Sequence, residues 1–264
     1  RNTDGSFAGP VSGLGSSANE TTNPIAMAEY NNAENDRYKI NGNLYADFTL
    51  TKGLVFRSEL GYDLNFAKSS SFAPAYTLGN VSELLNKSFK QQDQSFYWSI
   101  KNYLTYNKTF NDKHNFTFLL GQEAQESQWE YLSGYRTGDF LNKDFTNLNL
   151  GDIDSALNQN GSGRWSMTSY ISRLNYSFSD RYSFSASLRA DASSNFGPNN
   201  KWATFPSVSF GWNVTNESWM QKRPDWLTNM KVRLSWGKNG NENIGEYMYQ
   251  AVMSRNNMTY NFNG

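Results

Sequence analysis

The sequence predicts an all-β protein that forms an antiparallel segment of a transmembrane β-barrel. Three segments between Tyr182 and Gly237 alternate apolar and polar residues, which gives each predicted strand one apolar and one polar side. The predicted strands are long, and the connections between them alternate between short turns and long loops. An aromatic fraction of 16% occurs together with a mean hydropathy of −0.72. This combination is typical of a barrel with an aromatic outer surface and a polar lumen.

Charge and residue usage exclude several classes of function. The 24 basic and 24 acidic residues give a net charge of zero. This balance gives no support to a nucleic acid or an anionic lipid surface as a partner bound by overall charge. Cysteine is absent, which excludes disulfides and thiol chemistry. No run of about 18 apolar residues exists, which excludes a transmembrane helix. No apolar signal core follows Arg1, so we expect either a mature chain or a piece of a longer one.

The expected organisation is one barrel domain with irregular ends. Residues 1–37 are rich in Asn, Gly, Ser and Thr and predict an extracellular loop region, with a disordered tail as an equal alternative. Residues 38–237 predict barrel strands and their connections. Residues 238–264 predict an extracellular loop and the start of a further strand near Tyr249–Met253.

The first predicted hairpin has arms of unusual length. Tyr38–Leu50 and Leu54–Phe66 turn through Thr51-Lys52-Gly53 and carry their apolar residues on the same side. Each arm reaches the ~9–11 residues that a tilted strand needs to cross a bilayer, whereas soluble strands have a mode near 5–6 residues. A long polar stretch, Ala67–Gln94, follows.

The second predicted hairpin has a less regular return strand. Phe96–Tyr106 turns through Asn107–Lys113 and returns on Phe116–Leu120, with Asn102 interrupting the apolar stripe. Gln122 and Glu126 interrupt it again, so we expect this strand to end early and a long outer segment to run from residue 125 to 164.

The last part of the chain predicts three further strands. Tyr170–Phe178 leads through the short turn 179–181 into the strand that starts at Tyr182. Pro206 has no backbone N–H, so we expect a strand start or a bulge at this position. Asn216–Thr228 predicts one or two helical turns across the end of the sheet, before the strand Met230–Trp236.

The order of connection lengths separates two fold classes. Transmembrane barrels place short turns at the periplasmic rim and long loops outside, while a β-sandwich has no reason to sort loop lengths by end. Aromatic residues also gather near the strand ends, for example Tyr38, Phe66, Phe96 and Tyr182, as interfacial girdles require. The pattern favours a membrane barrel, and a soluble all-β protein is the alternative.

Charged residues of both signs fall on the polar sides of the predicted strands. In a barrel they would line the lumen and pair with one another or with a plug, whereas in a sandwich they would be solvated. The mixed signs favour a structural network over an ion filter. The candidates for this lumen-facing charge network are Arg57, Glu59, Asp63, Lys101, Arg173, Arg189, Asp191, Lys231 and Arg233.

Four residues in the expected outer segment are candidates for substrate binding. Trp129, Tyr131, Tyr135 and Arg136 combine flat apolar rings with polar edges, which suits a ligand. Packing of a loop on itself or against a lid is the competing interpretation of these residues.

Catalytic and metal sites find little support in the sequence. His114 is the only histidine, and a rim position explains it better than a catalytic triad does. His- or Cys-based metal sites are excluded by count. Oxygen ligands in residues 152–160 lack EF-hand spacing, so Ca²⁺ in this loop stays an open question.

Several motifs resemble those of the SusC-like (SusC/RagA-type) TonB-dependent outer-membrane transporters. They are Leu188-Arg189-Ala190-Asp191, Ser193-Ser194-Asn195-Phe196-Gly197, Phe205-Pro206-Ser207-Val208-Ser209, Gly211-Trp212, Lys231-Val232-Arg233-Leu234-Ser235-Trp236-Gly237 and Asn239-Gly240-Asn241. Gly42-Asn43-Leu44-Tyr45 and Leu104-Thr105-Tyr106-Asn107-Lys108 are also similar to that family's barrel. Ala192 and Asn195 depart from the family pattern, in which Gly and Arg are commoner.

The resemblance implies an internal piece of a plugged barrel of roughly 22 strands, of which about 8–9 are present here. It implies import of a large nutrient, an oligosaccharide or a peptide, with a SusD-like surface lipoprotein outside and the TonB complex inside. Neither a cofactor nor catalysis is implied. Rival hypotheses are a soluble β-sandwich carbohydrate-binding module, a passive outer-membrane porin and an outer-membrane barrel enzyme.

Overall fold

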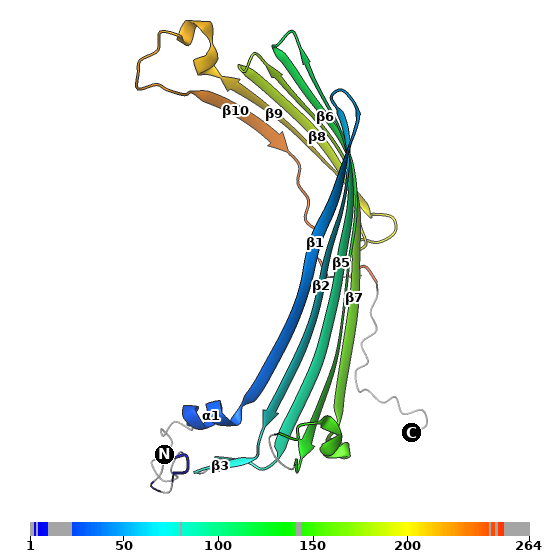
Figure 1. Cartoon of the computed structure of the whole chain (residues 1–264), viewed down its shortest axis with the longest axis vertical. Helices are drawn as coiled ribbons and strands as arrows, with labels where there is room; N and C mark the ends of the chain where they lie inside the picture. Colours follow the sequence, from blue (N-terminus) through cyan, green and yellow to red (C-terminus); the bar gives the residue numbers. More distant parts are fainter. Residues whose placement is uncertain are drawn as a thin grey trace, which may run out of the picture. The chain divides into compact units, whose positions relative to one another are not determined.

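The computed structural model confirms the all-β fold class (Figure 1). It describes residues 3, 5–9, 23–79, 81–140, 144–242, 244–245 and 248–250. The strands are β1 (Asn32–Thr51), β2 (Leu54–Ala73), β3 (Tyr76–Leu78), β4 (Val81–Glu83), β5 (Asn86–Phe110), β6 (His114–Gly138), β7 (Leu157–Phe178), β8 (Tyr182–Ser193), β9 (Trp202–Asn213) and β10 (Lys231–Gly237). The helical elements are α1 (Pro24–Tyr30), η1 (Leu148–Leu150), η2 (Ile153–Ser155), η3 (Val214–Asn216) and η4 (Ser218–Met220).

The sheet is a meander. Its eight strands lie in the order β1-β2-β5-β6-β7-β8-β9-β10, and β3 and β4 form a separate hairpin. Strands that follow one another along the chain are therefore neighbours in space, as an up-and-down barrel wall requires. Within the described residues β1 and β10 are the two edge strands, which explains why nearly all of their side chains are exposed.

The register keeps apolar and polar residues on opposite sides. Leu188 pairs with Ser172 on β7 and with Pro206 on β9, and Trp212 pairs with Val232 on β10. Even-numbered residues thus pair with even-numbered residues, so they share one side of the sheet. We call the side with even numbers the apolar face and the side with odd numbers, which carries Arg189, the polar face.

Short turns occur at the three predicted places, although the second is confined to residues 111–113 because β5 continues to Phe110. Gly53, at the β1–β2 turn, has a φ of 82° that suits glycine. Asn111 and Asp112 have φ of 50° and 49° between β5 and β6, and Ser179 and Asp180 have φ of 50° and 55° between β7 and β8. Asn and Asp tolerate this left-handed conformation better than other side chains do.

Two stretches expected to be loops are largely strand, so that expectation was wrong. β2 continues to Ala73 and β5 begins at Asn86, while β6 continues to Gly138 and β7 begins at Leu157. Polar residues did not end these strands because their side chains find partners on the neighbouring strand. The cross-strand pairs include Gln94 with Glu130, Tyr97 with Gln125 at 2.8 Å and Arg164 with Glu126 at 2.6 Å.

A row of polar side chains crosses the apolar face. Ser58 Oγ donates to Asn102 Oδ1 at 2.8 Å, and Asn102 Nδ2 donates to Gln122 Oε1 at 3.0 Å. These residues interrupt the apolar stripes of β2, β5 and β6, and the structure brings the interruptions together. Hydrogen bonding satisfies groups that would be costly to leave unpaired in an apolar environment.

Pro206 lies inside β9, not at a strand start or a bulge as we expected. It is paired with Leu188, and its carbonyl oxygen accepts from the backbone N–H of Lys238 at 3.0 Å. The N and O atoms of one residue point to the same side of a strand, so the missing N–H faces Lys238, just past the end of β10 at Gly237. The reciprocal bond of this pair cannot form, and the β9–β10 ladder ends here.

The predicted N-terminal loop region contains regular structure. β1 begins at Asn32, before the expected start at Tyr38, and α1 precedes it. Asn23 caps α1 by accepting from the backbone N–H groups of Ile25 and Ala26, and Pro24 occupies the first turn. At the other end, residues 248–250 are turn and bend, and the rest of the strand predicted near Tyr249–Met253 lies outside the described residues.

The chain divides into two compact units. The first comprises Arg1–Asn41, Asp63–Phe96 and Gln128–Gly163, and the second comprises Gly42–Tyr62, Tyr97–Ser127 and Arg164–Gly264. In the first unit, α1, the β3–β4 hairpin and the β6–β7 connection gather at the ends of the strands (Figure 1). Ala26, Phe72, Leu78 and Phe140 are buried there, and the rings of Phe72 and Phe140 pack edge to face with centroids 5.6 Å apart.

The β9–β10 connection in the second unit is folded onto the apolar face. Two 3-10 turns, η3 and η4, confirm the predicted helical character. The buried Glu217 carboxylate accepts from Tyr182 Oη at 2.5 Å, Trp212 Nε1 at 3.0 Å and Arg181 Nη1 at 3.3 Å. One carboxylate thus holds the connection to β8 and β9.

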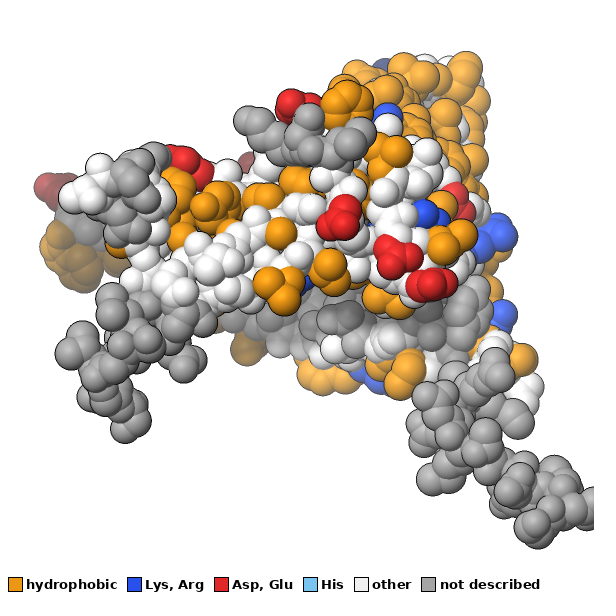
Figure 2. Space-filling view, turned by 90° about the horizontal axis from the view of Figure 1, so that it is seen from below, with side chains coloured by type: hydrophobic (Ala, Val, Ile, Leu, Met, Phe, Trp, Pro, Cys, Tyr) orange, Lys and Arg blue, Asp and Glu red, His pale blue; other side chains and the backbone are white. Residues whose placement is uncertain are grey.

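Seen from the end that carries α1, the near face shows acidic side chains lying among polar and hydrophobic ones (Figure 2). Among the described residues, none of the helices is both long and apolar enough to cross a bilayer.

Candidate functional site on the polar face

A hydrogen-bonded network centred on one guanidinium connects four strands on the polar face. Arg189 Nε donates to both carboxylate oxygens of Asp191, at 2.7 and 2.9 Å. Its Nη2 donates to Glu123 at 3.1 Å and to Ser169 Oγ at 2.8 Å. Glu123 also accepts from Tyr103 Oη. We call these five residues the Arg189 network.

Sequence position explains why the network can form. Its members come from β5, β6, β7 and β8 and all have odd numbers, so they project to the same side. The Tyr103 ring lies across Gly121, where a Cβ atom would be 2.8 Å from Tyr103 Cδ1. Glycine at this position leaves the room that the ring needs to reach Glu123.

Other ion pairs lie on the same side of each strand. In the second unit, Arg57 binds Asp47 through two hydrogen bonds of 2.6 Å, and Lys101 lies 3.5 Å from Glu59. In the first unit, Lys39 lies 2.9 Å from Asp63. Opposite charges on neighbouring strands are thus matched locally.

Six of the nine predicted network residues form ion pairs: Arg57, Glu59, Asp63, Lys101, Arg189 and Asp191. Within the described part of the chain, no ion pair involves Arg173, Lys231 or Arg233. Lys231 and Arg233 lie on an edge strand, which has a neighbour on one side alone. Their lumen-facing role stays a prediction.

The sequence reasoning missed Glu123, the residue that links β5 to β8. We expected the strand to end near Gln122, so we did not extend the alternation of polar and apolar sides to residue 123. Continuing that alternation through Gln122 would have placed Glu123 on the polar face.

The aromatic candidates lie in β6 and not in a loop, so the expected location was wrong. The rings of Trp129 and Tyr131 are nearly parallel, with centroids 6.3 Å apart and an interplanar angle of 5°. Tyr131 lies against Gly161, where a Cβ would be 2.6 Å from the ring. These rings and Tyr135 have odd numbers and therefore project to the polar side of β6.

Arg136 is separated from the other three candidates. Its even number directs it to the opposite side of β6, and its Nη1 donates to the carbonyl of Gly151 in the β6–β7 connection at 3.4 Å. The structure thus brings the three rings to one side and leaves the guanidinium on the other.

His114 packs among aromatic residues at a short turn. Its Nδ1 lies 2.9 Å from Tyr176 Oη, and its ring centroid lies 4.8 Å from that of Phe178. In the described ranges no cluster of three or more His, Asp or Glu could hold a metal ion. Asp152, in the segment 152–160 considered above for Ca²⁺, caps η2 by accepting from the backbone N–H of Asp154.

Comparison with known proteins identifies the family. A family model described as "TonB dependent receptor-like, beta-barrel" matches residues 1–264. The chain belongs to this family. The TonB-dependent receptor family consists of outer-membrane β-barrels that are transporters and receptors, not enzymes. The soluble β-sandwich alternative is therefore wrong.

Relatives and solved structures agree with this family. The chain is 32% identical to TonB-dependent receptor P39 of Formosa agariphila over 228 residues, which is 85% of this chain and 22% of that protein. It is 28% identical to TonB-dependent receptor SusC of Bacteroides thetaiotaomicron over 257 residues, or 95% of this chain and 24% of that protein. This TonB-dependent receptor chain thus spans about a quarter of these relatives' length.

The structure of the RagAB peptide transporter superposes on the chain with a TM-score of 0.85 at 26% identity. The match covers 95% of this chain and 28% of that one. The SusC-like resemblance seen in the sequence is confirmed by these findings.

Proposed function

We propose that this chain forms part of the wall of a bacterial outer-membrane transporter that imports a large nutrient with energy from the TonB complex. A SusD-like surface lipoprotein is the expected partner, and an oligosaccharide or a peptide is the expected substrate. The relatives named SusC and RagAB, the latter a peptide transporter, support this proposal.

The Arg189 network is the observation that carries the proposal. Charged groups are costly in hydrocarbon unless they face an enclosed polar space and pair with one another. On β8 the charges of Arg189 and Asp191 are paired on the polar face, while Phe184 and Leu188 are 40% and 48% exposed on the apolar face. This division supports lipid on the apolar side and an aqueous lumen on the polar side.

The three rings of β6 are the substrate contacts that we propose. Trp129, Tyr131 and Tyr135 would offer flat apolar surfaces with polar edges to a sugar or a peptide that enters the lumen. We exclude Arg136 from this role because it projects to the other side and holds the β6–β7 connection.

Uptake by the full-length protein in its host tests both parts of the proposal. Replacing Trp129 and Tyr131 together by Ala should lower substrate affinity about tenfold or more, since stacking on each ring contributes on the order of 1 kcal/mol. Leu132→Ala is the matched control, because Leu132 is 62% exposed on the opposite side of the same strand. Equal affinity in all three proteins would contradict the substrate role.

Energy dependence separates active import from a passive porin. Uptake should be lost when TonB is deleted or the proton gradient is collapsed. Saturable uptake that persists without TonB would favour the porin and overturn the proposal.

A further inference from the structure

The second unit contains a hollow on its polar face, close to the short turns. It has a volume of about 210 Å³ and is lined by residues of β6, β7, β8 and β9. Asn115 lies just past the turn at residues 111–113, and Ser183 lies just past the turn at residues 179–181. We call this the serine hollow, and its polar lining includes Asn115, Thr117, Asn175, Ser183, Ser185 and Ser209. All six have odd numbers, so they project to the polar face.

The lining of the serine hollow offers hydrogen bonds without charge. In the described part of the chain, no charged side chain lines it. Ser185 Oγ donates to Asn175 Oδ1 at 2.7 Å, and Asn115 Nδ2 donates to Ser177 Oγ at 3.4 Å. Hydroxyl and amide groups both donate and accept hydrogen bonds, but they cannot neutralise a cation that lies beside them.

Arg173 is a cation without a partner beside the serine hollow. It lies on β7, two residues before Asn175 and on the same side of the strand. Its partner on β8 in the register is Ser187, and no described residue forms an ion pair with it. Because β7 has a neighbouring strand on each side, a missing strand does not explain the unpaired charge.

Two more cations lie on β10, at the other side of the hollow. Arg233 is paired in the register with Gly211, which is paired in turn with Ser183 of the hollow. A Cβ atom at Gly211 would lie 3.4 Å from Lys231 Cε, so the Lys231 side chain passes over this glycine. Both cations are exposed, and neither forms an ion pair with a residue that the structure describes.

The charges left unpaired on the polar face of the second unit are all positive. Every carboxylate on this face of the described strands already has a cation within ion-pair distance; these carboxylates are Asp47, Glu59, Glu123 and Asp191. The cations that they bind are Arg57, Lys101 and Arg189. Arg173, Lys231 and Arg233 therefore make this face a surface that favours anions.

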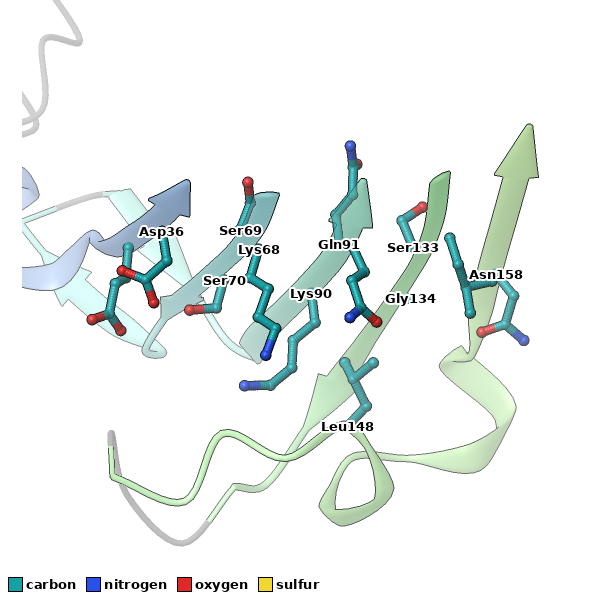
Figure 3. A pocket seen from close by; sticks show the side chains of 13 residues that line it. Asp36, Lys68, Ser69, Ser70, Lys90, Gln91, Ser133, Gly134, Leu148 and Asn158 are labelled. Carbon is teal, nitrogen blue, oxygen red and sulfur yellow. The ribbon is translucent and has the colours of Figure 1, made fainter. Parts of the chain in front are cut away.

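The larger cavity of the first unit, of about 510 Å³, has no such surplus. Lys68 and Lys90 line it together with Glu34 and Asp36, and Figure 3 shows Asp36 and both lysines around the same pocket. Its positive and negative groups balance in number, so that cavity favours neither sign of ligand.

An acidic sugar has the groups that the serine hollow and its cations can bind. A guanidinium binds a carboxylate or a sulfate through two parallel hydrogen bonds, and hydroxyl and amide side chains match sugar hydroxyls. The volume is below the ~300–1,000 Å³ of sites that enclose a whole drug-sized ligand. The hollow therefore fits one sugar unit of a longer chain.

We propose that the serine hollow binds an acidic sugar unit of an oligosaccharide substrate inside the lumen. Arg173 and Arg233 bind its carboxylate or sulfate, and the hydroxyl and amide groups of the hollow bind its ring hydroxyls. Short turns are periplasmic in outer-membrane barrels, so this contact is made near the periplasmic end of the wall. The inference rests on the proposed function, because it names the substrate class of that transporter and requires the polar face to line the lumen.

Binding of acidic oligosaccharides to the full-length protein in detergent tests the proposal. The probes are oligogalacturonate, oligomannuronate and a sulfated galactan oligosaccharide, each compared with its methyl-esterified or desulfated neutral form. At least one acidic probe should bind about tenfold or more tightly than its neutral form at low salt, because charge-assisted hydrogen bonds are lost in the neutral form. The difference should shrink as salt is added. No preference for any acidic probe would overturn the proposal.

Variants of the two arginines locate the contact. Arg173→Gln and Arg233→Gln should each lower the preference for the acidic probe about fivefold, and the double variant should abolish it. Lys108→Gln is the matched control, since it removes a cation near the same end of the sheet from the apolar side of β5, where Lys108 lies above the ring of Phe110. An unchanged preference in the double variant would overturn the proposal.

Unfolding of Arg173→Gln by denaturant distinguishes a ligand from a partner within the protein. The midpoint should stay the same as in the wild type, because no described residue forms an ion pair with this guanidinium. A lower midpoint with an unchanged preference for the acidic probe would show that Arg173 neutralises a carboxylate of the protein, which would overturn its role in binding.

A peptide probe and uptake separate this inference from the proposed function. Hexaglutamate should show a weaker dependence on the two arginines than the acidic sugars do, and an equal dependence would overturn the saccharide assignment. TonB-dependent uptake without any preference for acidic probes would contradict this inference alone. A preference that depends on Arg173 and Arg233 in a protein without TonB-dependent uptake would support the site and contradict the proposed function.

Discussion

At the scale of single residues, Arg189 is the side chain on which most of the polar contacts depend. Its planar guanidinium reaches Asp191, Glu123 and Ser169 together, and the Ser169 side chain beneath it is 1% exposed. Lysine, with a single point charge, cannot reproduce these directions.

We predict that Arg189→Ala lowers the free energy of unfolding of the full-length protein by about 2–4 kcal/mol, because it leaves Glu123 and Asp191 without their cation. Arg189→Lys should recover less than half of this loss. Unfolding in detergent by denaturant measures both changes.

Arg173→Ala is the control for Arg189. Arg173 lies on the same polar face as Arg189, on the neighbouring strand β7, and no described residue forms an ion pair with it. A loss as large as that of Arg189→Ala would show that charge alone, and not the network, accounts for the effect.

At the residue scale, unbroken alternation was enough to assign a side chain to one side of its strand, while the lumen-facing role stays a prediction. The charged residues Arg57, Glu59 and Arg189 were placed on the polar side by parity alone, and the structure pairs them there. Their partners across the sheet could not be predicted, because the register between strands is not encoded in the period of one strand.

At the scale of elements, the β9–β10 connection depends on the ionised form of Glu217. The hydrogen bond from the Tyr182 hydroxyl, and then that from the Trp212 indole, lower the pKa of this carboxyl, while burial opposes the shift. A lowered pKa in the folded state means that the stabilisation is present above the unfolded pKa of ~4.3 and is lost as pH falls through the folded pKa.

We therefore predict that the connection opens on acidification, at a pH below the unfolded carboxyl pKa of ~4.3. Limited proteolysis with an acid-active protease should cut residues 214–230 faster at pH 3 than at pH 5 in the wild-type protein. Glu217→Gln should be cut faster at pH 5 already and should show a weaker dependence on pH. Identical cutting of both proteins at every pH would rule out a role for this carboxylate.

Element boundaries were predicted well at turns and poorly at polar strand ends. The structure has turns at both Thr51-Lys52-Gly53 and Ser179-Asp180-Arg181. Each contains a residue that tolerates the left-handed backbone conformation, Gly53 in the first and Asp180 in the second. β6 was predicted too short because Gln122 and Glu126 look unfavourable in isolation. Their partners, Asn102 and Arg164, come from other strands and are invisible to a local pattern.

At the scale of the whole molecule, the assignment of the two faces decides the function. A charge placed on a lipid-facing surface near the bilayer midplane costs ~2–4 kcal/mol, whereas a change on a lumen-facing surface costs little. Neighbouring residues of one strand can therefore report which side meets lipid.

We predict that Leu60→Arg destabilises the full-length protein in a bilayer by about 2–4 kcal/mol. Leu60 is 43% exposed on the apolar face of β2. The adjacent Glu59→Gln should cost at most about 1 kcal/mol, because the pair with Lys101 is long at 3.5 Å and partly exposed. Refolding into lipid vesicles measures both, and equal costs would contradict the assignment of faces.

The hydrogen-bonded row of Ser58, Asn102 and Gln122 has a consequence for how the wall assembles. Sliding β5 by two residues against β2 would keep every side chain on its side, so hydrophobicity alone permits that error. The shift would also leave the Asn102 amide in hydrocarbon without its hydrogen-bond partners Ser58 and Gln122, which is costly. The three polar groups thus favour the native register over a two-residue shift while the strands insert into the membrane.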